Sequence, residues 1–263
     1  KGFEVTYLPV KNNGLVDIEL FKNALQSDTI LVSVMYVNNE TGTIQPLKEL
    51  SALSHSNGSL FMTDATQAVG KIEVDVDDLD VDLLCLSGHK MYAAKGIGAL
   101  FVRNRKRKVG LDPLIHGGGH EQGLRSGTLN VPGVISLAKA CEISKEEMES
   151  NEEKISELRD ELEAQLLKFK NASVIGDQNR RIFNTTNICF KGEDASVLIA
   201  RMRGVAVSNG SACSSAVIEP SHVLRAMGLT DEDAFSCLRF SLGNYNTSED
   251  IRTVVDNLKK IIG

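Results

Sequence analysis

The sequence predicts an α/β fold, in which helices cover a sheet. Three short apolar runs, over residues 29–37, 60–63 and 81–86, each end in small polar or charged residues. These runs are apolar at nearly every position rather than at every second one, which favours strands buried on both faces. A helical segment over 46–56 separates the first two runs, and such alternation of strands and helices is typical of layered α/β domains.

The composition excludes several other classes of protein. The 263 residues are 42% hydrophobic and 24% charged, with 22 Gly and 5 Pro, which suits one large core or two domains and excludes a disordered chain. No stretch approaches 18 uninterrupted apolar residues, so we expect no membrane span. The first residues, Lys1–Val5, lack both an initiating Met and the regions of a signal peptide. We therefore expect the chain to begin inside a domain.

The charge pattern gives no sign of a nucleic-acid interface. The net charge is −6, and the segment 142–163 alone contributes −7, with ten acidic and three basic residues. The rest of the chain is therefore close to neutral, whereas nucleic-acid binding needs basic residues gathered on one face. The one basic run, 103–108, directly follows the strand-like stretch 96–102, and we interpret it as a solvated turn.

A long helix is predicted over 132–170. Its apolar residues recur at spacings of three, four and seven and form one stripe: Met148, Ile155, Leu158, Leu162, Leu166 and Phe169. Short strands around 186–190 and 204–207 follow, and then helices up to Ile262. We therefore expect two domains linked by the helix, a larger one over 1–141 and a smaller α+β domain over 142–263.

The five cysteines indicate a reducing compartment. They form no CxxC pair and no zinc-like spacing, and an odd, scattered set is typical of free thiols in a cytoplasmic protein. Four of them have apolar neighbours and are expected in the core: Cys85, Cys141, Cys189 and Cys237. His116 and His120 flank three glycines, which makes a ligating helix improbable, so no metal is expected.

Lys90 and Asp64 each follow a predicted strand. Lys90 ends the tetrapeptide 87–90, and a partly desolvated lysine there can have a lowered pKa and form a Schiff base. The alternative is an exposed loop lysine. Asp64 lies 26 residues earlier, and a lone Asp there is more often a helix cap. Together, however, the two suit pyridoxal phosphate, whose aldehyde carbon binds a Lys and whose pyridine nitrogen needs an Asp.

Other residues extend this cofactor hypothesis to the phosphate and the substrate. Ser87, His89 and Thr128 are candidate phosphate donors. Arg239 lies in the apolar stretch 237–241, where a guanidinium needs an anion, either a substrate α-carboxylate or an Asp or Glu of the protein.

Cys213 lies in a different setting from the other thiols. The nine residues 208–216 are all small, which predicts a loop that carries a thiol. Such a loop can bring its thiol to a substrate and then to an acceptor. A flexible linker with an incidental cysteine is an equally good interpretation of this segment alone.

Taken together, these segments resemble the cysteine desulfurases of the NifS/IscS type, a class V aminotransferase-like branch of the fold type I pyridoxal-phosphate enzymes. The matching motifs occur in family order along nearly the entire chain. They are Val37-Asn38-Asn39-Glu40-Thr41-Gly42, Asp64-Ala65-Thr66-Gln67, Ser87-Gly88-His89-Lys90, His116-Gly117-Gly118-Gly119-His120-Glu121, Arg125-Ser126-Gly127-Thr128, Ser211-Ala212-Cys213 and Arg239-Phe240-Ser241-Leu242-Gly243.

The resemblance implies a fold and an activity. The fold is the three-layer large domain of the pyridoxal-phosphate transferases, incomplete at the N-terminus, with a smaller C-terminal domain. The activity is removal of sulfur from L-cysteine, giving L-alanine and a persulfide on Cys213. The sulfur passes to an iron–sulfur scaffold or another acceptor protein, and the enzyme is a homodimer.

The resemblance also implies a role for each site residue. Lys90 holds the cofactor and moves protons, and Asp64 pairs with the pyridinium. Gln67 bonds the phenolic oxygen. The remaining cofactor and substrate contacts come from Asn39 (cofactor and substrate carboxylate), Ser87 and His89 (phosphate), Thr128 (phosphate of the partner subunit) and Arg239 (substrate carboxylate).

Family members begin well upstream of this sequence. The upstream part supplies a helix N-terminus that binds the phosphate and a His that stacks on the ring, so we expect the isolated chain to bind cofactor weakly. One alternative function is therefore a catalytically silent fragment that acts as a scaffold. Another is a related lyase that acts on selenocysteine or cysteine sulfinate.

Overall fold

The computed structural model describes residues 2–104, 107–210 and 219–263. The chain forms two compact units. The first unit contains residues 1–24, 37–46 and 149–263, and the second contains 25–36 and 47–148. The expected division into domains at residues 141 and 142 stays a prediction.

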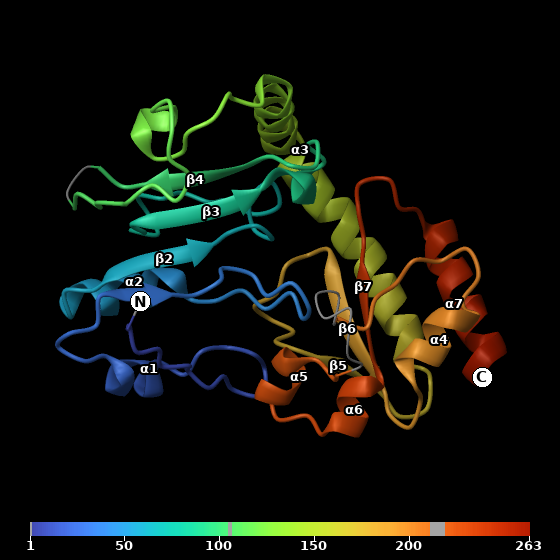
Figure 1. The fold of residues 1–263 in the computed structure, drawn as a ribbon. Coiled ribbons are helices and arrows are strands. Elements are labelled where there is room, and N and C mark those ends of the chain that lie inside the picture. Colours follow the sequence, from blue (N-terminus) through green and yellow to red (C-terminus); the bar gives the residue numbers. More distant parts are fainter. Residues whose placement is uncertain (1, 105–106, 211–218) are drawn as a thin grey trace. The chain divides into compact units, whose positions relative to one another are not determined.

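A four-stranded sheet forms the centre of the second unit (Figure 1). Its strands lie in chain order: β1 (Leu31–Ser33), β2 (Leu60–Asp64), β3 (Leu83–Ser87) and β4 (Gly98–Val102). The first three are parallel, and β4 runs antiparallel to β3. Helix α2 (Leu47–Ser56) connects β1 to β2 and packs against β2. The carboxyl ends of β2 and β3 therefore lie at the same edge of the sheet.

Burial on both faces is wrong for the outer strands. In β1, Val32 is buried but Leu31 is 45% exposed, and the first three residues of β4 are exposed. Only Leu83 and Leu84 of β3 are buried in succession. The two outer strands β1 and β4 lie at the edges of the sheet, and α2 packs against the inner strand β2.

Within the described part of the basic run, Arg103 and Arg107 do not form the expected solvated turn. Arg103 is 3% exposed and donates through Nε to the carbonyl oxygen of Val81 over 2.7 Å, and through Nη1 to Asp77 over 2.7 Å. Arg107 forms ion pairs with Asp80 and Asp82. The prediction fails at these two arginines because acidic residues of the preceding loop, distant in sequence, supply the partners.

The first unit is built on an antiparallel sheet of β5 (Ala172–Ile175), β6 (Thr185–Phe190) and β7 (Cys237–Ser241). All six residues of β6 are buried. Strand β5 was not expected, and the strand expected at 204–207 is wrong, since only Ser208 forms an isolated bridge, with Arg239. The helices of this unit are α1 (Ile18–Ala24), α4 (Ala195–Arg201), α5 (His222–Ala226), α6 (Asp231–Phe235) and α7 (Ser248–Ile262).

The predicted long helix is confirmed as α3 (Val131–Leu166), which runs from the second unit into the first but ends before Phe169, the last residue of the predicted stripe. Its apolar stripe is buried at Ile155, Leu158, Leu162 and Leu166. Most of its acidic residues are exposed, as expected. Glu163 is the exception, because it is buried against Arg181 and Thr186.

The cysteines divide by position. Cys189 and Cys237 are buried, as expected, and face each other across β6 and β7. Cys85 is half-buried. The expected core position of Cys141 is wrong, because it lies on an exposed part of α3. Cys213 lies outside the described residues. Among the residues described, none of the helices has the length and apolar character needed to cross a membrane.

Candidate functional site

Asp64 and Ser87 end two adjacent parallel strands of the second unit. Asp64 lies opposite Cys85 in the register of β2 and β3, two residues before Ser87. The exposed Asp64 carboxylate accepts a hydrogen bond from the backbone N–H of Thr66 over 2.8 Å. This contact closes a turn, and no helix begins after Asp64, so the helix-cap alternative considered for a lone Asp is wrong. The site residues 64, 67, 87, 89 and 90 lie at or directly after these two strand ends, where ligands of parallel sheets bind.

Gln67 is held by a lysine that the sequence analysis missed. Lys71 Nζ donates to the carbonyl oxygen of Gln67 over 3.1 Å and to its Oε1 over 3.3 Å. Burial, together with the nearby charge of Lys90, lowers the pKa of Lys71 to about 8. In the sequence, the spacing of four residues between Gln67 and Lys71 was the signal that could have predicted this contact.

Lys90 lies on a short 3-10 helix, η1 (Gly88–Met91), that begins directly after β3. Its side chain is exposed, whereas Gly88 and Met91 are buried and anchor the turn. Tyr92 ends the turn with a left-handed backbone, at φ 66°. The chain thus presents Lys90 to solvent from a turn fixed on both sides.

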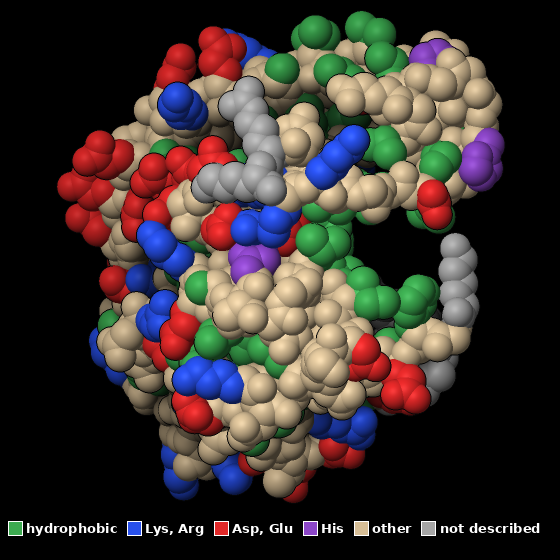
Figure 2. All heavy atoms as spheres, turned by 90° about the vertical axis from the view of Figure 1, so that its left-hand side faces the viewer, with side chains coloured by type: hydrophobic (Ala, Val, Ile, Leu, Met, Phe, Trp, Pro, Cys, Tyr) green, Lys and Arg blue, Asp and Glu red, His purple; other side chains and the backbone are tan. Residues whose placement is uncertain are grey.

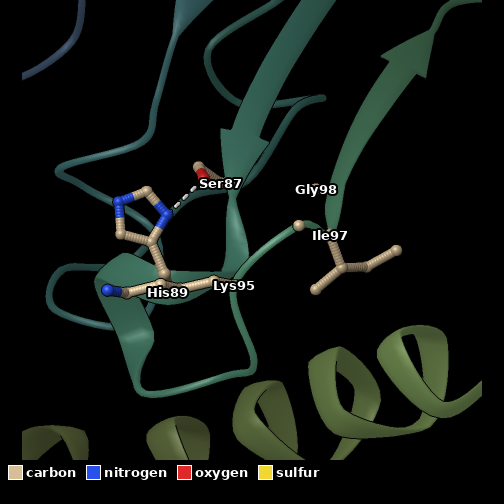
Figure 3. A pocket seen from close by; sticks show the side chains of 6 residues that line it. Ser87, His89, Lys95, Ile97 and Gly98 are labelled. Carbon is tan, nitrogen blue, oxygen red and sulfur yellow. Dashed lines mark hydrogen bonds between the residues drawn. The ribbon is translucent and has the colours of Figure 1, made fainter.

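A pocket lies beside this turn (Figure 3). It has a volume of about 490 Å³ and is lined by Ser87, His89, Lys95, Gly96, Ile97 and Gly98. Ser87 Oγ and His89 Nδ1 are 2.8 Å apart and share a hydrogen bond. A Cβ on Gly98 would lie 2.5 Å from the carbonyl oxygen of Leu86, so only glycine permits this approach of β4 to β3. Two predicted phosphate donors and the unpredicted Lys95 therefore share one pocket.

In the first unit, Arg239 is held beside Asn39. Its Nη1 donates to the carbonyl oxygen of Asn39 over 2.9 Å. Burial lowers the pKa of Arg239, and the charge of Glu40 opposes that shift. Its buried Nε has no hydrogen-bond partner, and no ion pair joins Arg239 to a carboxylate within the described part of the chain. A structural salt bridge, the alternative considered for this arginine, is therefore not formed there.

Three further predictions concern Thr128, Cys213 and metals. Thr128 is exposed. Its expected role toward a partner subunit stays a prediction, as does that of Cys213. Across the residues with described positions, no group of three or more His, Cys, Asp or Glu is placed to hold a metal ion.

The sequence matches the family model "Aminotransferase class-V" over residues 1–254. The chain belongs to the class-V aminotransferase family. This confirms the predicted resemblance at the level of the family, and the mixed parallel sheet of the second unit agrees with the α/β fold expected for it.

The class-V chain is also similar to proteins named as cysteine desulfurases. It is 49% identical to the mitochondrial cysteine desulfurase of Arthroderma benhamiae over 99% of this chain and 52% of that protein. It is 47% identical to cysteine desulfurase IscS of Haemophilus influenzae over 98% of this chain and 64% of that protein. A solved NifS-like protein is 36% identical, with a TM-score of 0.90 over 99% of this chain and 68% of that one. The chain thus spans about half to two thirds of the length of these relatives.

Proposed function

We propose that this class-V family member binds pyridoxal phosphate and removes sulfur from L-cysteine. The observation that carries the proposal is the pair of parallel strands β2 and β3, whose adjacent ends bear Asp64 and the segment 87–90. The names of the relatives support the same activity and substrate.

The residues at these strand ends fit the proposed cofactor. Its aldehyde, pyridine nitrogen and phosphate require an amine, a carboxylate and a set of donors, which Lys90, Asp64 and the pocket at Ser87 and His89 supply. When bound, pyridoxal phosphate accepts the electron pair released at the substrate carbon. We propose that Lys90 binds the aldehyde carbon and moves protons, and that Asp64 keeps the pyridine nitrogen protonated.

Hydrogen-bond donors orient the rest of the cofactor in this proposal. Gln67 donates to the phenolic oxygen through its amide, while its Oε1 accepts from Lys71. Ser87 and His89 bind the phosphate, and Thr128 reaches the phosphate held by a partner subunit. Lys95 lines the same pocket and adds a positive charge.

Asn39 and Arg239 bind the substrate in this proposal. Arg239 receives the α-carboxylate of cysteine, for which its unpartnered Nε is a free donor among the described residues. The Cys213 thiolate attacks the substrate sulfur. One S–S bond forms, one C–S bond breaks, and L-cysteine plus the thiol become L-alanine plus a persulfide on Cys213.

A homodimer is also part of the proposal. Between residues 92 and 135 of the second unit, ten large apolar side chains are between 36% and 91% exposed: Tyr92, Leu100, Leu111, Leu114, Ile115, Leu124, Leu129, Val131, Val134 and Ile135. Figure 2 shows hydrophobic side chains exposed on the face turned toward the viewer. Exposed apolar surface of this extent marks an interaction site. We further propose a cytoplasmic location and delivery of the persulfide sulfur to an iron–sulfur scaffold or another acceptor.

The first experiment is the visible spectrum of the chain with added pyridoxal phosphate, before and after L-cysteine. We expect a cofactor band that borohydride fixes to Lys90 and that shifts with cysteine. An unchanged band in Lys90→Ala would contradict the role of Lys90. A persulfide that still accumulates in Cys213→Ser would show that another thiol carries the sulfur. A folded chain with no band would contradict independent activity and favour the scaffold function.

A further inference from the structure

Glu40 is a buried carboxylate that contacts both ends of the segment containing Cys213. It is 4% exposed. Its Oε2 accepts a hydrogen bond from Ser221 Oγ over 2.6 Å. At the other end, a Cβ built on Gly210 would lie 2.5 Å from the same Oε2, so the Gly210 backbone packs directly on this carboxylate. Two residues eleven positions apart thus meet at one oxygen atom.

The backbone of Glu40 is itself fixed. Asn38 Oδ1 accepts from the N–H of Glu40 over 2.9 Å and from that of Thr41 over 3.0 Å, which closes a tight turn. The carbonyl oxygen of Glu40 accepts from Nδ2 of the fully buried Asn187, on β6. The carboxylate is therefore presented from a rigid turn tied to the sheet.

Both ends of the segment are tied to the same framework. Ser221 begins α5, and its Oγ accepts from the N–H groups of Val223 and Leu224 while it donates to Glu40. Gly210 donates its N–H to Ser208 Oγ over 3.1 Å, and Ser208 pairs with Arg239 on β7. Gly210 has φ +87°, so a side chain there would be strained as well as in collision with Glu40.

The charge of Glu40 links these contacts to the substrate arginine. Burial raises the pKa of Glu40, whereas the bond from Ser221 and the charges of His222 and Arg239 lower it. Removing one partner from a buried, hydrogen-bonded charge leaves the other groups without compensation. Here the dependent groups are the Ser221 hydroxyl, the Gly210 backbone and the Arg239 guanidinium.

We propose that Glu40 is a positioning residue that fixes both roots of the Cys213 segment, Gly210 and Ser221, against the strand that bears Arg239. The inference rests on the proposed role of Cys213. Cys213 lies between these two roots in the sequence, so loss of their anchoring should slow its proposed reaction with a substrate bound by Arg239.

Hydrogen exchange of the full chain tests the structural half of the proposal without any activity. The variants are Glu40→Ala, Glu40→Gln and the matched control Glu163→Ala. Glu163 is a second buried carboxylate of the same unit, and it also accepts from a hydroxyl, that of Thr186, over 2.6 Å. We expect Glu40→Ala to speed exchange at 208–210 and 221–224 about tenfold, the effect of one lost bond to a charged group. Glu40→Gln should restore most of the protection, and Glu163→Ala should leave these two segments unchanged.

Trapping of the Cys213 persulfide tests the functional half. In Glu40→Ala we expect the cysteine-induced spectral change to persist while the rate of persulfide formation falls about tenfold or more, as for other losses of positioning. Glu40→Gln should retain most of the rate. Ser221→Ala keeps the Glu40 carboxylate and should lower the rate of persulfide formation by a smaller factor. It replaces Glu40→Ala as the test if that variant does not fold.

The two proposals fail in different ways. Wild-type protein that shows no persulfide contradicts the proposed function, and the exchange data still decide the role of Glu40. Unchanged exchange at both roots in Glu40→Ala would overturn the positioning role. So would a persulfide rate equal to that of the wild type, or an equal loss of protection in Glu163→Ala.

Discussion

Lys71 Nζ donates to both oxygen acceptors of Gln67, its carbonyl oxygen at 3.1 Å and its Oε1 at 3.3 Å. The second bond assigns Oε1 to the lysine and leaves the amide NH₂ as the donor toward a ligand. The positive charge of the nearby Lys90 also contributes to the lowered pKa of Lys71. Burial of the Lys71 charge therefore costs folding stability, while its two hydrogen bonds fix the orientation of Gln67.

We predict that Lys71→Met stabilises the chain at pH 7 by about 1–2 kcal/mol while it weakens cofactor binding. Burial lowers the pKa of Lys71 from 10.5 to about 8, so its charged form is disfavoured in the folded state. Below pH 8 both states are protonated and the wild type carries the full cost. Between pH 8 and 10.5 only the unfolded state holds the proton, so wild-type stability rises and the advantage of the variant shrinks. Urea unfolding at pH 7 and pH 10 measures this, and a variant less stable than wild type at pH 7 would contradict it.

The two buried carboxylates of the first unit should respond to pH with opposite signs. Burial raises the pKa of Glu163, but the bonds from Arg181 and Thr186 outweigh it and hold the pKa below 4.5. Glu163→Gln should therefore cost about 1–3 kcal/mol at pH 7, and the difference should vanish as the pH falls through the folded pKa. The pKa of Glu40 is raised by burial, so Glu40→Gln should be neutral or stabilising above that pKa, and its difference from wild type should shrink toward pH 4.5. Unfolding curves between pH 3 and 8 compare the two variants. If both substitutions lowered the free energy of unfolding at pH 7, the opposite pKa shifts assigned to Glu163 and Glu40 would be wrong.

Arg103 should contribute to stability rather than to binding. It is buried and donates to the Val81 carbonyl and to Asp77, so Arg103→Met removes a buried donor from the Val81 carbonyl and breaks the ion pair with Asp77. We expect a loss of about 2–4 kcal/mol in the free energy of unfolding. Lys108→Met, at an exposed position of the same run, should change it by less than about 0.5 kcal/mol. Equal effects of the two substitutions would support the solvated turn after all.

Strand ends explain why much of the candidate site was predictable. Asp64 and Lys90 follow apolar runs long enough to identify as strands, and parallel strands bring such ends together. Arg103 and Cys141 were misjudged because burial depends on partners distant in sequence. The loop that carries Asp77 pairs with Arg103, whereas Cys141 is an exposed residue of α3 whose thiol contacts Met91.

Glu40 and Lys71 were missed as site residues for a related reason. Glu40 appeared within a matching motif, but its contacts with Gly210 and Ser221 span about 170–180 residues of sequence and follow no local pattern. Lys71 has a local signal, the spacing of four from Gln67, but its lowered pKa arises from burial and from Lys90. Hydrophobic periodicity predicts which residues form elements, and only tertiary packing shows which charges those elements enclose.

The exposed apolar side chains of the second unit predict a self-associating surface. Ile135 and Leu114 are 63% and 91% exposed, and a lysine at either position would place a charge on the interface of the proposed homodimer. We expect Ile135→Lys to raise the dimer dissociation constant at least about tenfold, since a charge buried without a partner costs more than 1.4 kcal/mol. Val197→Lys, at a 43% exposed apolar residue of α4 in the other unit, should leave the constant unchanged. Sedimentation equilibrium measures both variants. A wild-type chain that stays monomeric at high concentration, or equal effects of the two substitutions, would show that this surface does not bind a second copy.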